Sequence, residues 1–130
     1  MDKIIIFLKL IFHISVLILI ILSLYPGSLL GLFFYNDLGR QPNLVENPFG
    51  ASFNHFATYL YVSTLGFFLY SKSDKFIKLV YIMFILSIIL ELLQFIIPIR
   101  ALQLYDLIAN FLGVLVAYFL VKIYLHFIRP

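Results

Sequence analysis

The apolar stretch "SIILELLQFIIPIRALQLYDLIANFLGVL" at residues 87–115 carries several strongly polar side chains, among them Glu91, Gln94, Arg100, Asp106 and Asn110. Carboxyl groups can exchange protons, a guanidinium matches a carboxylate or a phosphate, and amides can hydrogen-bond a ligand or a neighbouring helix. A charged side chain near the centre of a bilayer costs about 2.5–3.5 kcal/mol on insertion scales. Such groups persist where they face a bundle interior, pair with one another or serve a function.

The composition indicates that lipid is the solvent of this chain. Of its 130 residues, 64% are hydrophobic and 12% are charged, and the mean hydropathy is +1.10. Soluble domains are roughly 45–50% apolar and about 25% charged, and small ones leave much of their surface outside. The absence of cysteine excludes disulfides, a thiolate nucleophile and cysteine-ligated metal.

Four segments are long and apolar enough to predict transmembrane helices, at about 4–25, 53–70, 76–97 and 104–127. We therefore expect an all-α fold, a bundle of four transmembrane helices in a single domain over 1–130. The first apolar run is too long for a signal peptide, and Pro98 ends the third helix. A long loop at 26–52 contains the run "LLGLFF", which is too short to span and is expected to lie in the outer interface.

The distribution of basic residues predicts the orientation. Lysine and arginine concentrate on cytoplasmic flanks. One side of the predicted bundle has only Arg40 and Arg100, and the other has Lys3, Lys9, Lys72, Lys75, Lys78, Lys122 and Arg129. Both termini are therefore expected to be cytoplasmic.

Helices that run in alternating directions bring the polar residues to one depth, in the outer third of the membrane. Asp106 and Asn110 are one turn apart on one helix face, and Asp106 near a helix start interacts well with the positive end of the dipole. Gly113 would let a neighbouring backbone come close just beneath them. Glu91 is expected to be protonated near neutral pH unless Arg100 or a histidine reaches it.

The pattern "ELLQFIIPIR…YDLIANFLG" resembles the signature of the VanZ-like family, which combines Glu-x-x-Gln, Pro-x-Arg and Asp-x-x-x-Asn-x-x-Gly. The matching positions are Glu91, Gln94, Pro98, Arg100, Asp106, Asn110 and Gly113. The upstream "HFATY" resembles the family's His-Phe-x-x-Tyr at His55, Phe56 and Tyr59. The chain departs from the family at Ala51 and Ser52, where members often carry Asp-Lys. The resemblance implies a small multi-pass protein of the bacterial cytoplasmic membrane with a role in the cell envelope, and the family's namesake is associated with teicoplanin resistance.

These observations leave three functional classes open. The chain could bind or handle a lipid-linked or amphiphilic molecule at the outer leaflet, such as a cell-wall precursor. It could be an intramembrane acid/base enzyme on a lipid substrate, with Glu91, Asp106 or His55 as the catalytic candidates. It could also be a structural or accessory subunit of a homo-oligomer or membrane complex. The predicted ligand-binding residues are His55, Tyr59, Glu91, Gln94, Arg100, Asp106 and Asn110, and Pro98 and Gly113 are expected to be structural.

Several other kinds of site are not expected. The lysines are scattered rather than gathered in a stripe, so a nucleic-acid partner is not predicted. No cofactor is predicted. A metal site is not predicted, because the chain has no His-x-x-x-His or Glu-x-x-His spacing and His13 and His126 lie at other levels. Ser52, Asn54 and Thr58 are interpreted as capping and packing groups.

Overall fold

The computed structural model describes residues 2–44 and 47–128, and this part of the chain is helical with no strand. The elements are α1 (Lys3–Leu24), α2 (Leu29–Tyr35), α3 (Ser52–Tyr70), α4 (Phe76–Leu93) with the 3₁₀ turn η1 (Gln94–Ile96), and α5 (Leu104–Ile128). The bounds predicted for the four long helices match α1, α3, α4 with η1, and α5 closely. α4 tightens into η1 before Pro98, and Ile97 is extended, as expected for a residue before proline.

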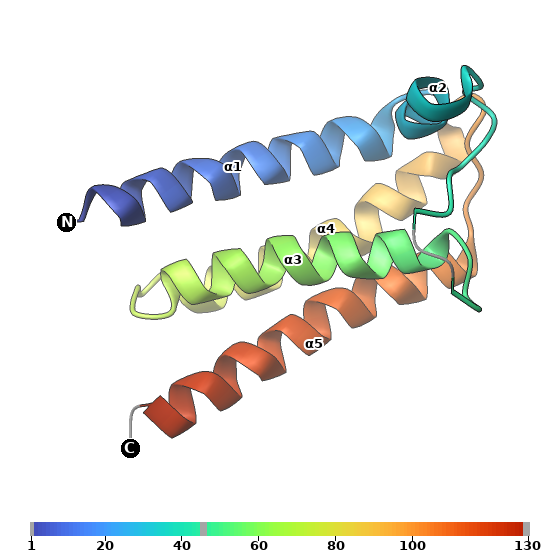
Figure 1. Ribbon diagram of the computed structural model, residues 1–130. Helices are drawn as coiled ribbons and strands as arrows, with labels where there is room; N and C mark the ends of the chain where they lie inside the picture. Colours follow the sequence, from blue (N-terminus) through green and yellow to red (C-terminus); the bar gives the residue numbers. More distant parts are fainter. Residues whose placement is uncertain (1, 45–46, 129–130) are drawn as a thin grey trace.

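The four long helices lie side by side (Figure 1). The short α2, η1 and the α4–α5 link gather at one end, which we call the α2 end, whereas α1 begins and α5 finishes at the opposite end. α3 and α5 make the most extensive contact, and α3 also contacts α1 and α4. α3 is therefore the central helix of the bundle.

A glycine allows the close approach of α3 and α5. A Cβ built on Gly113 would lie 2.7 Å from the carbonyl oxygen of Phe56 and 2.9 Å from the Cβ of Tyr59. Any side chain at this position would push against the backbone of α3. Gly113 thus lies at the point where the backbones of α3 and α5 come close.

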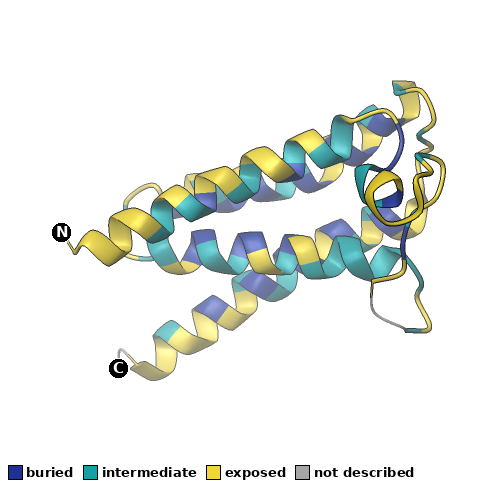
Figure 2. Ribbon diagram, turned by 45° about the horizontal axis from the view of Figure 1, so that its top comes forward, coloured by how far each residue is buried: buried dark blue, intermediate teal, exposed yellow. Residues whose placement is uncertain are grey.

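The outer surface of the bundle is apolar. Large hydrophobic side chains are exposed along α1 and α5, including Phe7, Leu17, Leu112 and Ile123 (Figure 2). Within residues 2–44 and 47–128, three helices are long and apolar enough to cross a membrane: Lys3–Leu24, Phe76–Ile96 and Leu104–Ile128. An exposed apolar surface of this extent needs a lipid environment, so the chain is a membrane protein.

α3 stands apart from those three helices. Its 19 residues include Asn54, His55 and Ser63, and it is not among the helices apolar enough to qualify by composition. Thr58, Tyr61 and Phe68 are the only exposed residues of α3, so this helix is largely covered by its neighbours and has less need of an apolar surface all round. That α3 spans the membrane stays a prediction.

The loop at 26–52 contains the short helix α2. The hydroxyl of Ser28 accepts a hydrogen bond of 2.9 Å from the Gly31 N–H, and Asn36 terminates the helix in the left-handed conformation at φ 52°. The carbonyl groups of Asp37 and Arg40 approach Gly31 so closely that a Cβ could not fit. The run "LLGLFF" is thus a tight helical turn held by its own loop, and its interfacial position stays a prediction.

The opposite end of the bundle carries basic residues. The ammonium of Lys9 lies 4.9 Å from the ring centroid of Tyr70, at the end of α3. The lysine side chain therefore extends from α1 toward the end where the chain begins. Arg129, which contributed to the predicted orientation, lies outside the described residues.

Candidate functional site

Buried polar side chains collect at the α2 end of the bundle. Glu91, Gln94, Asp106 and Asn110 are each exposed by 3% or less. They come from α4, η1 and α5, and no contiguous segment contains all of them. The structure therefore brings together residues that were predicted to share one level.

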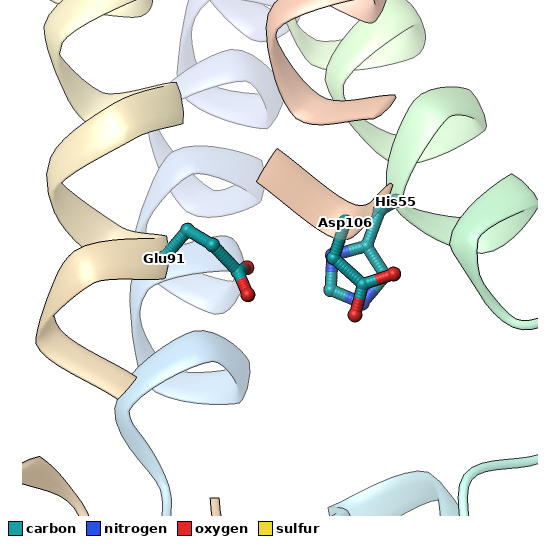
Figure 3. Close-up of side chains that lie close together, drawn as sticks. All are labelled: His55, Glu91 and Asp106. Carbon is teal, nitrogen blue, oxygen red and sulfur yellow. The ribbon is translucent and has the colours of Figure 1, made fainter. Parts of the chain in front are cut away.

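Three ionisable residues form the centre of this site. His55 on α3, Glu91 on α4 and Asp106 on α5 point toward one another (Figure 3), and one potential ligand atom from each lies within 4.8 Å of the others. His55 Nε2 and Asp106 Oδ2 lie 3.5 Å apart. We call these residues the His–Glu–Asp cluster. They are also the three residues predicted as acid/base candidates.

Asn110 fixes the orientation of the histidine. Its amide nitrogen faces α4, where it lies 3.5 Å from the Ser87 carbonyl oxygen and 3.4 Å from Glu91 Oε2. A backbone carbonyl can only accept a hydrogen bond, so this side of Asn110 must be the NH₂ group. The Asn110 oxygen therefore faces His55 Nδ1 at 3.1 Å, and we assign the ring proton to Nδ1. Nε2 is left facing Asp106.

Both carboxylates accept further hydrogen bonds. The Ser52 hydroxyl donates to Asp106 Oδ1 at 2.5 Å, and the backbone N–H of Gln103 donates to Glu91 Oε1 at 3.2 Å. Neither Ser52 nor the backbone of Gln103 was predicted as a partner from the sequence. Ser52 was interpreted as a cap or packing group and lies 54 residues from Asp106 in the chain. Gln103 contributes its backbone, which no residue type could reveal.

Arg100 extends to the end of α1 and forms hydrogen bonds there with backbone carbonyls. Its Nη2 donates to the Leu22 carbonyl at 2.6 Å and its Nε donates to the Tyr25 carbonyl at 3.2 Å. The last carbonyls of a helix lack partners within the helix, and Arg100 supplies them for α1. Burial lowers the pKa of the Arg100 guanidinium, and negative charge on Glu91 and Asp106 opposes this shift.

A strained residue precedes Arg100. Ile99 has a φ of 62°, in the left-handed region that β-branched residues rarely adopt. This conformation turns the chain between η1 and α5. The strain thus lies directly beside the residue that ties the link to α1.

Two other predicted site residues contact backbone groups. Gln94 Nε2 donates to the Ser23 carbonyl at 3.2 Å, again at the end of α1. Tyr59 is buried, and its hydroxyl lies 3.5 Å from the Leu86 carbonyl oxygen.

Glu91 accepts hydrogen bonds from neutral donors, and Arg100 donates its hydrogen bonds to α1 instead of to Glu91. The expected protonation of Glu91 stays a prediction.

Two cavities adjoin the polar residues. The smaller, of about 110 Å³, is lined by His55, Tyr59, Gln94 and Arg100 together with parts of α1 and α2. The larger, of about 310 Å³, lies against the loop that follows α1 and is lined by Gln94, Arg100 and Asp106. Five of the seven predicted ligand-binding residues therefore border space that a small polar group could occupy.

The cluster also bears on metal binding. The expectation of no metal site rested on spacing within single helices. The structure instead draws one residue from each of three helices to within 4.8 Å. A histidine and two carboxylates are a donor set that divalent cations accept.

The motifs at this site have a counterpart among known families. The sequence profile of the VanZ/LLP1 family matches residues 3–125. The chain belongs to the VanZ/LLP1 family. The resemblance inferred from the motifs is confirmed, and the match includes α1 and the loop before α3, which the motifs did not reach. No curated protein and no solved structure matches the chain.

Proposed function

We propose that this VanZ/LLP1 family protein binds the polar group of a lipid-linked or otherwise amphiphilic molecule of the bacterial cell envelope. The observation that carries the proposal is the pair of cavities lined by polar side chains at one end of an otherwise apolar bundle. Polar residues inside a membrane domain are costly and commonly mark a binding site.

The proposal includes an arrangement in the membrane. α3 spans the bilayer with α1, α4 and α5, both termini are cytoplasmic, and the α2 end faces the outer leaflet. Two observations support this. α3 is central and packs against the three apolar helices, and basic residues lie at the opposite end, including Lys9 beside Tyr70.

Size and charge favour a headgroup over a whole lipid. The larger cavity, about 310 Å³, is at the lower end of the range of roughly 300–1,000 Å³ for small-molecule sites. Arg100 lines both cavities, and its two hydrogen bonds to α1 use two of its five N–H donors. A phosphate or carboxylate in the cavity would match the remaining donors, while acyl or isoprenoid chains would lie against the apolar helix surface.

The test is native mass spectrometry with lipid analysis of the purified protein. Arg100→Gln removes the charge but also two supports of α1, so a second variant is needed. Ala101 lines the larger cavity, and Ala101→Leu should fill space there without removing a polar group. Ala109→Leu, on α5 and away from both cavities, is the matched control. We expect a defined anionic amphiphile on the wild type and the control, and its loss from Ala101→Leu. The same bulk lipid on all three proteins would refute the proposal.

A link to glycopeptide susceptibility follows if the bound molecule is a cell-wall precursor or the acylated antibiotic itself. We expect cells that produce the wild type to tolerate more teicoplanin than cells that produce Ala101→Leu. A glycopeptide without an acyl chain separates the two sources. Equal protection against both antibiotics would favour the precursor, whereas protection against teicoplanin alone would favour the acyl chain. No difference between wild type and variant would contradict the link.

One observation favours a catalytic alternative. The His–Glu–Asp cluster places three proton-exchanging groups within 4.8 Å, as an intramembrane acid/base enzyme on a lipid substrate would require. Glu91→Gln should then abolish turnover while the ligand stays bound.

The hydrogen bonds from Gln94 and Arg100 to α1 favour a third function, that of an accessory subunit in which the polar residues serve assembly. In that case Gln94→Leu should weaken recovery of a membrane partner or of a homo-oligomer and leave lipid content unchanged.

A further inference from the structure

We propose that His55, Glu91 and Asp106 bind one divalent transition-metal cation of the zinc class. The site would be formed by α3, α4 and α5 at the α2 end. This inference does not depend on the amphiphile, because the cation contacts the protein through side chains of the chain itself. It adds a metal ligand set to residues that were expected only to exchange protons or bind a headgroup.

The first argument is charge. Glu91 is fully buried and Asp106 is 2% exposed, and both carboxylates contribute an atom to the group that spans 4.8 Å. Two negative charges this close repel each other, and removing two carboxylates from water is costly unless they are paired or bind metal. In the part of the chain that the structure describes, the one basic side chain in contact with either carboxylate is His55, whose Nε2 lies 3.5 Å from Asp106 Oδ2. Arg100, the nearby cation, donates to the carbonyls of α1.

The second argument is the state of the histidine ring. Asn110 holds the proton on Nδ1, so a neutral His55 presents the lone pair of Nε2 to Asp106 Oδ2 at 3.5 Å. Two acceptors that face each other repel unless a proton or a metal ion lies between them. Metal-binding histidines almost always donate their other ring N–H to a nearby oxygen, which fixes the tautomer and the ring orientation. His55 has this arrangement with Asn110.

The carboxylates are also held as metal ligands usually are. Ser52 donates to Asp106 Oδ1, which leaves Oδ2 on the side of His55. Glu91 accepts from the backbone of Gln103 and from Asn110. Hydrogen bonds of this kind orient ligating groups and are part of a working metal site.

The distances fit a zinc-sized ion after a small adjustment. Ligand atoms about 2.0–2.2 Å from a tetrahedral zinc ion lie about 3.4 Å apart. The His55–Asp106 pair, at 3.5 Å, already has this separation. The widest separation allowed in the group is 4.8 Å, so closure requires a movement of at most about 1.4 Å. Rotation of the Glu91 side chain can supply that movement.

The three ligands favour one class of ion and leave one coordination position of that ion open. Imidazole favours zinc and related transition metals over magnesium and calcium, which prefer oxygen ligands alone. Three protein ligands leave a fourth position open, as in catalytic rather than structural zinc sites. His55 lines one cavity and Asp106 lines the other, so the fourth position would be reached by water or by a phosphate or carboxylate oxygen.

The test is metal binding by the full chain, purified through a tag without histidine, stripped with a chelator and titrated by calorimetry in detergent without envelope lipid. We expect one Zn²⁺ per chain and an affinity order of Zn²⁺ above Mn²⁺ above Mg²⁺. His55→Gln and Asp106→Asn should abolish this binding. Ser52→Ala should weaken it by roughly 10–100-fold, as loss of a supporting hydrogen bond does. His126→Gln, at the opposite end of the bundle, is the control and should bind as the wild type does.

A stability measurement separates loss of the site from loss of the fold. Glu91→Gln keeps the shape of the side chain and removes one of the two neighbouring carboxylates. In the stripped state, this variant should be at least as stable as the wild type. Zn²⁺ should raise the unfolding temperature of the wild type and leave that of Glu91→Gln unchanged. Absence of saturable Zn²⁺ binding, or binding that survives His55→Gln combined with Asp106→Asn, would overturn the inference. Lipid retention is measured independently, so either proposal can fail alone.

Discussion

The contact between Gly113 and α3 allows a quantitative prediction for Gly113→Ala. The new Cβ would lie 2.7 Å from the Phe56 carbonyl oxygen, where ordinary contact begins at 3.4 Å. The neighbour is backbone and cannot rotate away, so α3 and α5 must separate by about 0.7 Å. The polar site lies about one turn from this contact. The same movement would stretch the 3.1 Å contact between His55 and Asn110 beyond hydrogen-bonding distance.

The free energy can be bounded from three contributions. Overpacking a helix contact costs about 1–3 kcal/mol, and loss of the His55–Asn110 hydrogen bond costs a further 0.5–1.5 kcal/mol or so. The higher helix propensity of alanine returns about 1 kcal/mol. Gly113→Ala should therefore lower the free energy of unfolding by about 0.5–3.5 kcal/mol, measured by chemical unfolding in detergent.

Two comparisons make this result decisive. A Cβ at Gly66 would meet the ring of Phe12, which is the end of a side chain and can move. Gly66→Ala should therefore cost less and should leave the NMR resonances of the His55 ring unchanged, whereas Gly113→Ala should shift them. If Gly113→Ala were as stable as the wild type or more stable, helix propensity would dominate and the close-packing argument would be refuted.

Three other predictions concern the link and the topology. Arg100→Gln should lower the free energy of unfolding by about 2–4 kcal/mol, because hydrogen bonds from charged donors contribute roughly 1.5–3 kcal/mol each and one of the two is solvent-exposed. Arg100→Lys should recover part of this loss. If Arg100→Gln were as stable as the wild type, the assigned contacts would be contradicted. Ile99→Gly should raise the free energy of unfolding by up to about 1 kcal/mol, because it removes the left-handed strain at φ 62°. The control, Ile99→Val, should not be stabilised. A lower free energy of unfolding in Ile99→Gly would argue against strain. The chain has no cysteine, so single cysteines report topology cleanly: an impermeant maleimide on intact cells should label Gly39→Cys and spare Ser73→Cys, and the reverse pattern would overturn the orientation.

The shared level of the polar residues was predictable because it follows from helix geometry. Asp106 and Asn110 are one turn apart near the start of a helix, and Glu91 lies near the end of the preceding antiparallel one. A hydrophobic environment makes such residues easy to recognise, and their order along alternating helices gives their depth. Helix geometry also identified Gly113 as the position where a second backbone comes close.

The partners of Arg100 could not be predicted in the same way. They are backbone carbonyls at the end of α1, and a carbonyl has no signal in the residue type. The histidine contact with Asp106 was hidden for a related reason. Short-range spacing detects sites built on one helix, whereas here each of three helices contributes a single residue. α3 was harder to assess by apolarity because a central helix is partly shielded from lipid by its neighbours.

The hydrogen bonds at the end of α1 also determine when the site can form. Gln94 and Arg100 reach back across 71 and up to 78 residues to carbonyls of the first long helix. At synthesis rates of roughly 5–20 residues per second, Arg100 follows Leu22 by about 4–16 s. During that interval α1 is already at the membrane, and the carbonyls that Arg100 will pair with must rely on water or on the insertion machinery. Arg100 lines both cavities, so their lining is incomplete until this residue has been synthesised. A chain stalled before Arg100 would lie in the membrane without a binding site.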